Sequence, residues 1–350
     1  MLVGVNTLTI KPGFGGGEEH YLRHVLSSIR VLQPEIRFVV FTDADNHDSF
    51  EGWERVGVGG GSIDLGRLPG LDSQLERAAK RAGVDILFTP LRTALPKSSV
   101  PQVLFATDLL FVEPDFMPRR RREGAFIREV KRTCQQAVGV IAPSKFVQRR
   151  FLELLDLSLD KVTVAPLGVD PVFGQPFDCI AEQPYVLSVG ATHRFRNLPK
   201  LLEALQRLKD EIPHTLVVVG QAGDAEPHSW GARVVRVDRC PVAHLAGLYQ
   251  HCDVFVSASL YEGSGVTVLE AMCSGAAVAS SRVGGIPEVA GDIPVYFNPE
   301  NVGAIAGAIR RLTEENETNH GRRVRFGRQL AAQYTWEQCA WKTISAFRRA

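Results

Sequence analysis

Residues 255–272 of this chain read FVSASLYEGSGVTVLEAM, and this stretch decides the fold. An apolar strand ends at Ser257, a glycine-containing turn follows, and a helical stretch begins near Val266. Such a turn leaves the first amides of the helix without partners, and these amides bind phosphate and other anions. Glu262 lies on the turn and Glu270 lies within the helix, so two carboxylates suited to hydroxyl groups flank a phosphate site. This pattern predicts a ligand with both hydroxyls and phosphates, such as a sugar nucleotide.

The composition is that of an ordinary globular enzyme with two domains. The chain has 350 residues, of which 45% are hydrophobic and 23% are charged. Its net charge of +1 gives no reason to expect a nucleic-acid partner. Six scattered cysteines without metal-binding spacing are typical of free thiols in a reducing cytosol. The apolar run 2–5 has no basic residue before it, and no run is long enough to span a bilayer, so we expect a cytoplasmic protein.

Short apolar runs alternate with longer amphipathic stretches, which predicts parallel strands covered by helices. The strands are expected at 2–5, 38–42, 86–89, 103–106, 138–142 and 162–165, and then at 185–189, 216–220, 234–237, 254–257, 277–280 and 295–297. Helix breakers at 168–176 separate the two sets. We therefore predict an N-terminal domain over 1–168, a C-terminal domain over 169–335 and a final helix over 336–350. Two doubly wound sheets of this kind present their strand ends to a shared cleft.

A second glycine-rich turn follows the first strand, at residues 11–20, and a helix is expected from Glu19 to Arg30. Gly13 and Gly15 fit the spacing of a dinucleotide-binding loop, but Glu18 occupies the place of the third glycine, which argues against an NAD site. Adjacent glycines allow the backbone to approach a ligand closely. The loop is interpreted as a phosphate contact, with a merely flexible loop as the alternative.

Two arginines, Arg194 and Arg196, follow the strand that ends at Val189 and the glycine at position 190. Guanidinium groups at the carboxyl end of a strand can bind a diphosphate and stabilise a departing nucleotide. In isolation a solvated basic loop is the simpler interpretation. Further along, Gly284-Gly285-Ile286-Pro287 forms another glycine turn with proline at a helix start, a weak signal by itself.

Together these motifs resemble the retaining nucleotide-sugar glycosyltransferases of the GT-B fold (glycosyltransferase family 4-like, glycosyl transferases group 1). The resemblance is sharpest over residues 185–299. It implies two Rossmann-like doubly wound domains that face a central cleft. It also implies that Glu262 contacts the transferred sugar, that Glu270 binds the ribose hydroxyls, and that the final helix crosses back to the first domain.

The resemblance also implies the remaining site residues and shows two departures. The diphosphate is expected at Arg194 and Arg196, and the other donor-binding residues are Gly15, Gly16, Gly17, Thr107, Gly190, Ser264, Gly265, Val266 and Thr267. Where the family often has His-Asp, this chain has Thr107-Asp108, so Asp108 is expected to orient the sugar. Ser264 stands where the family usually has an aromatic residue.

The predicted activity is transfer of a hexose from a nucleotide diphosphate sugar to a hydroxyl acceptor with retention of configuration, in polysaccharide or glycoconjugate synthesis. UDP-sugars are favoured and GDP-sugars are the alternative. No Asp-x-Asp metal clip is visible, so no metal is expected. The acceptor is expected to be a saccharide or a lipid-linked saccharide. Two rival functions are a nucleotide-sugar 2-epimerase and a non-catalytic nucleotide-sugar-binding subunit, the second favoured by Thr107 and Ser264.

A basic stretch at residues 118–132 carries an apolar stripe of Phe126, Ile127 and Val130. One interpretation is peripheral contact with an anionic membrane on the inner face of the cell membrane. The other is an ordinary helix whose apolar side packs on its own domain, and this one is favoured.

Overall fold

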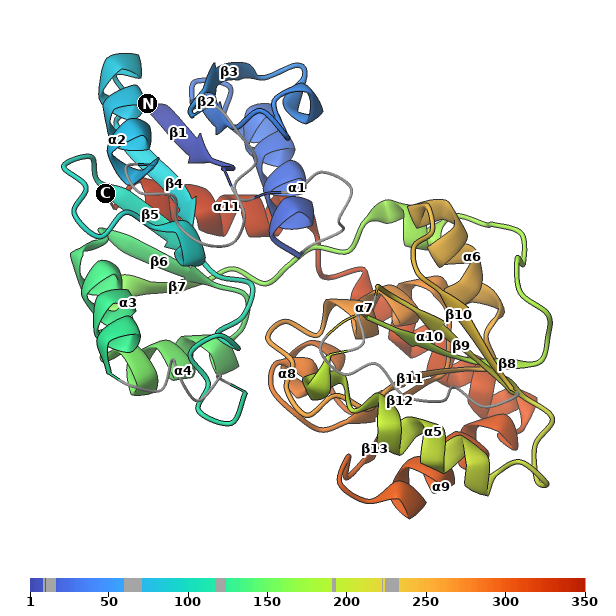
Figure 1. Cartoon of the computed structure of the whole chain (residues 1–350). Helices are drawn as coiled ribbons and strands as arrows, with labels where there is room; N and C mark the ends of the chain where they lie inside the picture. The colour runs from blue at the N-terminus through green and yellow to red at the C-terminus, as the bar shows by residue number, and fades with distance from the viewer. Residues whose placement is uncertain are drawn as a thin grey trace. The chain divides into compact units, whose positions relative to one another are not determined.

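In the computed structural model, the described residues are 1–8, 10, 17–59, 71–116, 124–190, 193–221, 223 and 233–349. They divide into two compact units (Figure 1). Unit 1 consists of Met1–Leu167 together with Trp336–Ala350, and unit 2 consists of Gly168–Thr335. Each unit contains one parallel sheet with helices packed on it, which confirms the predicted α/β class.

The described residues of unit 1 form a seven-stranded parallel sheet in the order β3-β2-β1-β4-β5-β6-β7. Its strands are β1 (Leu2–Asn6), β2 (Arg37–Thr42), β3 (Glu54–Gly57), β4 (Ile86–Pro90), β5 (Gln102–Phe105), β6 (Gly139–Ala142) and β7 (Val162–Val164). Its helices are α1 (Gly17–Leu32), α2 (Leu71–Ala82), α3 (Ala125–Gln136), α4 (Lys145–Leu155) and α11 (Trp336–Phe347). The strand order reverses direction between β1 and β4, and open sheets of this kind bind ligands at that switch point.

Helices cover both faces of the unit 1 sheet because successive strand residues point to opposite faces. On one face, Tyr21 of α1 lies with its ring centroid 4.8 Å from that of Phe105, and its hydroxyl is 3.2 Å from Oγ1 of Thr343 on α11. On the other face, Leu75 and Ala79 of α2 pack in one cluster with strand residues such as Leu87. The terminal helix α11 is therefore part of the core of unit 1.

The described residues of unit 2 form a six-stranded parallel sheet in the order β10-β9-β8-β11-β12-β13. Its strands are β8 (Tyr185–Val189), β9 (Thr215–Val219), β10 (Val234–Val237), β11 (Val254–Ser257), β12 (Val278–Ser281) and β13 (Val295–Phe297). Its helices are α5 (Leu198–Arg207), α6 (Val242–His251), α7 (Val266–Ser274), α8 (Ile286–Ala290), α9 (Val302–Thr313) and α10 (Glu317–Ala331). Here the order reverses between β8 and β11.

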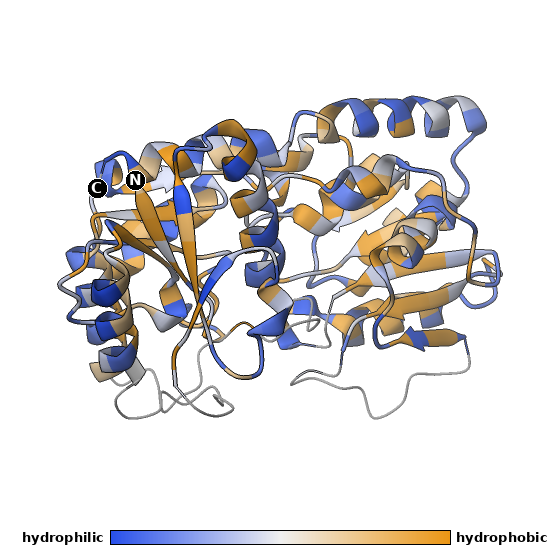
Figure 2. Ribbon diagram, turned by 90° about the horizontal axis from the view of Figure 1, so that it is seen from above, coloured by the Kyte–Doolittle hydropathy of each residue, from blue (hydrophilic) through white to orange (hydrophobic). Residues whose placement is uncertain are grey.

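Two apolar clusters sandwich the unit 2 sheet. Phe255 packs with α6 and α7 on one face, whereas its neighbours Val254 and Val256 pack with α5 and α9 on the other. Figure 2 shows the result, with hydrophobic strands running through the interior of each unit. A sheet buried on both faces is a rigid support for loops at its carboxyl edge.

The basic helix α3 belongs to the core of unit 1. Phe126, Ile127 and Val130 pack against a cluster that includes Cys134 and Phe151, so the apolar stripe is engaged within its own domain. The preceding arginines, at positions 119–122, lie outside the described residues. Among the helices that are described, none has the length and apolar character needed to cross a bilayer.

Candidate functional site

The predicted site residues of unit 2 converge at the switch point between β8 and β11. The turn η6 (Arg194–Arg196) follows β8, Glu262 follows β11, and the glycines at 284 and 285 follow β12. Because β8, β11 and β12 are neighbours and parallel, their carboxyl ends lie at one edge of the sheet. Segments up to 91 residues apart in the chain, from Arg194 to Gly285, therefore meet here, as the ligand rule for open α/β sheets predicts.

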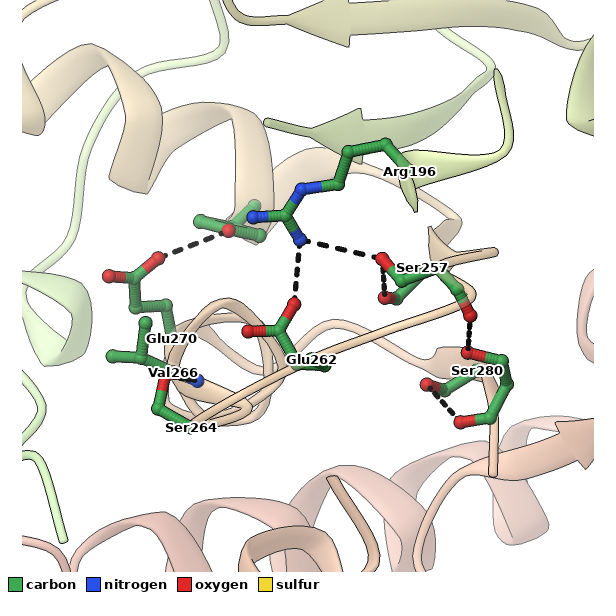
Figure 3. Close-up of polar contacts among 10 residues, drawn as sticks. Arg196, Ser257, Glu262, Ser264, Val266, Glu270 and Ser280 are labelled. Carbon is green, nitrogen blue, oxygen red and sulfur yellow. Dashed lines mark hydrogen bonds and ion pairs between the residues drawn. The ribbon is translucent and has the colours of Figure 1, made fainter. Parts of the chain in front are cut away.

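Arg196 and Glu262 form the centre of this site (Figure 3). An Nη atom of Arg196 donates to Oε2 of Glu262 at 2.7 Å and lies 3.4 Å from Oγ of Ser259. The guanidinium also lies 5.0 Å from the ring centroid of Phe195. Its Nε is buried and has no hydrogen-bond partner among the described residues. In Glu262 the bond from Arg196 uses Oε2, and within the described structure Oε1 has no partner. Buried polar groups normally have partners, so these atoms are suited to a ligand.

The start of α7 adds further unused donors beside this pair. Gly265 at its N-cap has φ 73°, and no side chain caps the helix there with a strong hydrogen bond. Oγ of Ser264 is 3.4 Å from the amide of Val266, a weak contact. Within the described structure, Oγ1 of Thr267 is buried without a partner. A helix start of this kind carries a partial positive charge and favours an anion.

Glu270 lies one turn into α7 and is only 9% exposed. The hydroxyl of Tyr249 on α6 donates to its Oε2 at 3.2 Å, and Oε1 has no partner among the described residues. Burial raises the pKa of Glu270 to about 8; the hydrogen bond from Tyr249 opposes this rise, while Asp170 and Glu262 add to it. Tyr249 is itself held between Phe173 and Phe255, at ring-centroid distances of 5.7 and 5.3 Å. The carboxyl is thus fixed in place with one oxygen free.

At two positions of the site the backbone lies so close to its neighbours that only glycine fits. Gly284 has φ 59°, and a Cβ there would lie 1.9 Å from the carbonyl oxygen of Glu262. The amide of Gly285 donates to that same oxygen at 2.9 Å. Gly265 faces Val289 of α8 in the same way, since its Cβ would lie 2.8 Å from a methyl group. The Gly284-Gly285 turn, weak as a sequence motif, therefore supports the Glu262 backbone.

Two further predicted site residues of unit 2, Gly190 and Arg194, lie near Arg196. Gly190 has φ 133°, and a Cβ there would lie 2.8 Å from Nε of Arg196, so the glycine leaves room for that side chain. Arg194 lies in the same turn as Arg196, but its side chain is exposed. Of the two arginines, Arg196 is the one bonded to Glu262.

Unit 1 brings Gly17, Thr107 and Asp108 together at its own switch point. Gly17 begins α1, and a Cβ on it would lie 3.8 Å from Thr107. Oδ1 of Asp108 accepts from the amide of Leu110 at 2.8 Å. Gly15 and Gly16 lie outside the described residues. Sequence reasoning gave no role to Glu18, although burial raises its pKa to about 7, with Arg92 opposing the rise and Asp108 adding to it.

Two family models match most of the chain. Residues 15–173 match "Glycosyltransferase Family 4", and residues 183–315 match "Glycosyl transferases group 1". The O-antigen chain mannosyltransferase B of Escherichia coli is 27% identical over 263 residues, which cover 68% of each chain. The MMP alpha-(1->4)-mannosyltransferase of Mycolicibacterium hassiacum is 24% identical over 246 residues, covering 67% of this chain and 59% of that protein.

Solved structures show the same fold over the whole chain. The sucrose-phosphate synthase of Thermosynechococcus elongatus superposes with a TM-score of 0.82 at 19% identity, covering 100% of this chain and 98% of that one. HepE of Anabaena, solved in complex with UDP, gives a TM-score of 0.75 at 17% identity, with 100% of both chains covered. The chain therefore belongs to the glycosyltransferases of the GT-B fold, with a family 4 domain followed by a group 1 domain.

Proposed function

We propose that the protein transfers a hexose from a nucleotide diphosphate sugar to a hydroxyl of a saccharide or lipid-linked saccharide, with retention of configuration, in polysaccharide or glycoconjugate synthesis. Unit 2 binds the donor. A UDP-sugar is the favoured donor and a GDP-sugar the alternative. The relatives named as mannosyltransferases support mannose as the hexose, and the Anabaena protein solved with UDP supports a uridine donor.

The observation that carries this proposal is the set of unused polar atoms around Arg196. The guanidinium, the start of α7 and Oγ1 of Thr267 offer donors to a diphosphate. The free oxygens of Glu262 and Glu270 offer acceptors to sugar and ribose hydroxyls. One site thus has partners for the diphosphate, the sugar and the ribose of a nucleotide sugar, as the sequence motif predicts.

In the proposed reaction the bond between the anomeric carbon and the diphosphate oxygen breaks, and a bond to the acceptor oxygen forms on the same face of the sugar. Arg196 and the start of α7 stabilise the charge that develops on the departing diphosphate. The acceptor proton passes to a phosphate oxygen of the leaving group, so no protein side chain is required as base. We assign the charge stabilisation to these residues rather than to a divalent cation.

The test compares Glu262→Ala with Glu203→Ala, a control in which the lost carboxylate pairs with Arg207 on the exposed surface of α5. Thermal shift with UDP, GDP and ADP first identifies the nucleotide; ligand at 100 times its dissociation constant stabilises a protein by about 2.7 kcal/mol. Transfer from the matching sugar nucleotide should fall about 100-fold or more in Glu262→Ala, with nucleotide binding retained. Unchanged transfer in that variant, or no response of the wild type to any nucleotide, would contradict the proposal.

A further inference from the structure

A hollow in unit 1 lies between helices α2 and α3 and takes no part in the proposed transfer. Its volume is about 780 Å³, which is within the usual range for sites that bind small molecules. Its walls come from the first half of α2, from the segment 95–97 between β4 and β5, and from α3. Two of its lining residues, Arg128 and Arg132, belong to the basic stretch 118–132, to which the donor site gives no role.

The segment that carries Lys97 is held in place on both sides of this residue. Before it, the amide of Leu95 donates to Oε1 of the buried Gln102 at 2.9 Å, and the carbonyl of Leu95 accepts from Nε2 of the same side chain at 2.8 Å. After it, the amide and the hydroxyl of Ser99 donate to Oε1 of Glu76 on α2, at 3.0 and 2.7 Å. Lys97 therefore projects from a backbone that is fixed before any ligand binds, as a binding site requires.

The opposite wall, α3, is fixed by its apolar stripe, which packs in the core of unit 1. Arg128 and Arg132 are four residues apart on this helix, so they lie on the same side of it and line the same hollow. Gly124, at the start of the helix, has φ 39°, and a Cβ there would meet the guanidinium of Arg128. The glycine thus leaves room for this side chain beside the hollow.

The charged groups that line the hollow differ in how they are paired. The acidic ones are engaged: Glu76 binds Lys80 at 3.2 Å in addition to Ser99, and Asp72 and Glu129 have partners of their own. The basic side chains make no hydrogen bond or ion pair with the residues that the structure describes; they are Lys97, Arg128 and Arg132. Unpaired charges of one sign around a hollow attract ions of the opposite sign.

We propose that this hollow is a second ligand site, separate from the donor site, and that Lys97, Arg128 and Arg132 bind the phosphate groups of an anionic ligand there. Guanidinium groups match pairs of phosphate oxygens, and lysine adds a point charge. Leu95 and Ala125 add apolar surface for the carbon part of a phosphate ester. A soluble phosphate ester and a phospholipid headgroup share this chemistry. The inference does not depend on the transfer reaction.

The first experiment titrates pyrophosphate into the full chain and measures the heat of binding. The double variant Lys97→Gln/Arg132→Gln should bind pyrophosphate at least tenfold more weakly than the wild type, because two of the three cations are lost. Arg37→Gln/Lys209→Gln is the matched control: it removes the same two charge types from exposed positions outside the hollow and should follow the wild type. Nucleoside diphosphate affinity reports on the donor site and should be equal in all three proteins.

The second experiment determines the source of the phosphate, by sedimentation of the same proteins with vesicles of phosphatidylglycerol and, as the control without net charge, of phosphatidylcholine. Binding to phosphatidylglycerol that the Lys97/Arg132 double variant loses assigns the hollow to a lipid headgroup. Loss of pyrophosphate binding alone assigns it to a soluble phosphate ester. A double variant that keeps the wild-type affinity for both probes overturns the inference, and so does a wild type that binds neither.

Discussion

Replacing Glu270 with glutamine should stabilise the ligand-free protein by an amount that grows with pH. Burial raises the pKa of Glu270 from 4.5 to about 8, so the folded chain holds this proton more tightly than the unfolded chain does. The wild type therefore loses stability as the pH rises through this interval, and a neutral amide of the same shape avoids the loss. The gain in unfolding free energy should be about 1 kcal/mol at pH 5, about 3 kcal/mol at pH 7 and about 5 kcal/mol at pH 9.

Urea unfolding of wild type and variant at these three pH values measures the difference. Glu314→Gln, at the exposed end of α9, is the control and should stay within about 0.5 kcal/mol of the wild type at each pH. A gain for Glu270→Gln that is the same at pH 5 and pH 9, or a loss at both, would refute the reasoning. The variant should also lose most of the stabilisation that a nucleoside diphosphate gives the wild type, because an amide replaces the carboxylate that accepts the ribose hydroxyls.

Two further predictions concern the supports of the site. Gly284→Ala should reduce transfer at least tenfold, because its Cβ would collide with the Glu262 carbonyl. Gly83→Ala is the control: Gly83 has φ 65° and open space around it, so this variant should lose about 1 kcal/mol of stability and leave transfer unchanged. Tyr249→Phe should weaken nucleotide binding about tenfold at pH 7 and move the onset of binding to higher pH. The hydrogen bond from Tyr249 lowers the pKa of Glu270, so its removal raises that pKa, and calorimetric titrations across pH measure both effects.

Most strands of the two sheets could be predicted, because the central strands are buried on both faces and appear in the sequence as apolar runs. The strand β3 could not, since Glu54–Gly57 is a half-exposed edge strand with the sequence ERVG and has no apolar run to reveal it. Helix α1 was expected to begin at Glu19 and begins at Gly17. This shift of two residues places Glu18 inside the first turn, where a reading of the glycine spacing alone gave it no role.

The site could be predicted only where its residues lie close together in the sequence. Glu262, Gly265 and Glu270 stand on one strand-turn-helix segment, and local pattern is enough to group them. The partners of these residues are distant in the chain: Arg196 precedes Glu262 by 66 residues and Tyr249 precedes Glu270 by 21. Such pairings depend on which strands become neighbours, and that order is a property of the whole sheet.

The switch point of unit 2 holds polar groups without partners among the described residues. These are Nε of Arg196 and Oγ1 of Thr267, which are buried, and one oxygen each of Glu262 and Glu270. Unsatisfied groups in such places lower stability, and apolar replacements would remove that cost, so folding alone does not explain their presence. A ligand does, because it supplies the missing partners. It follows that a nucleotide should stabilise unit 2 against unfolding.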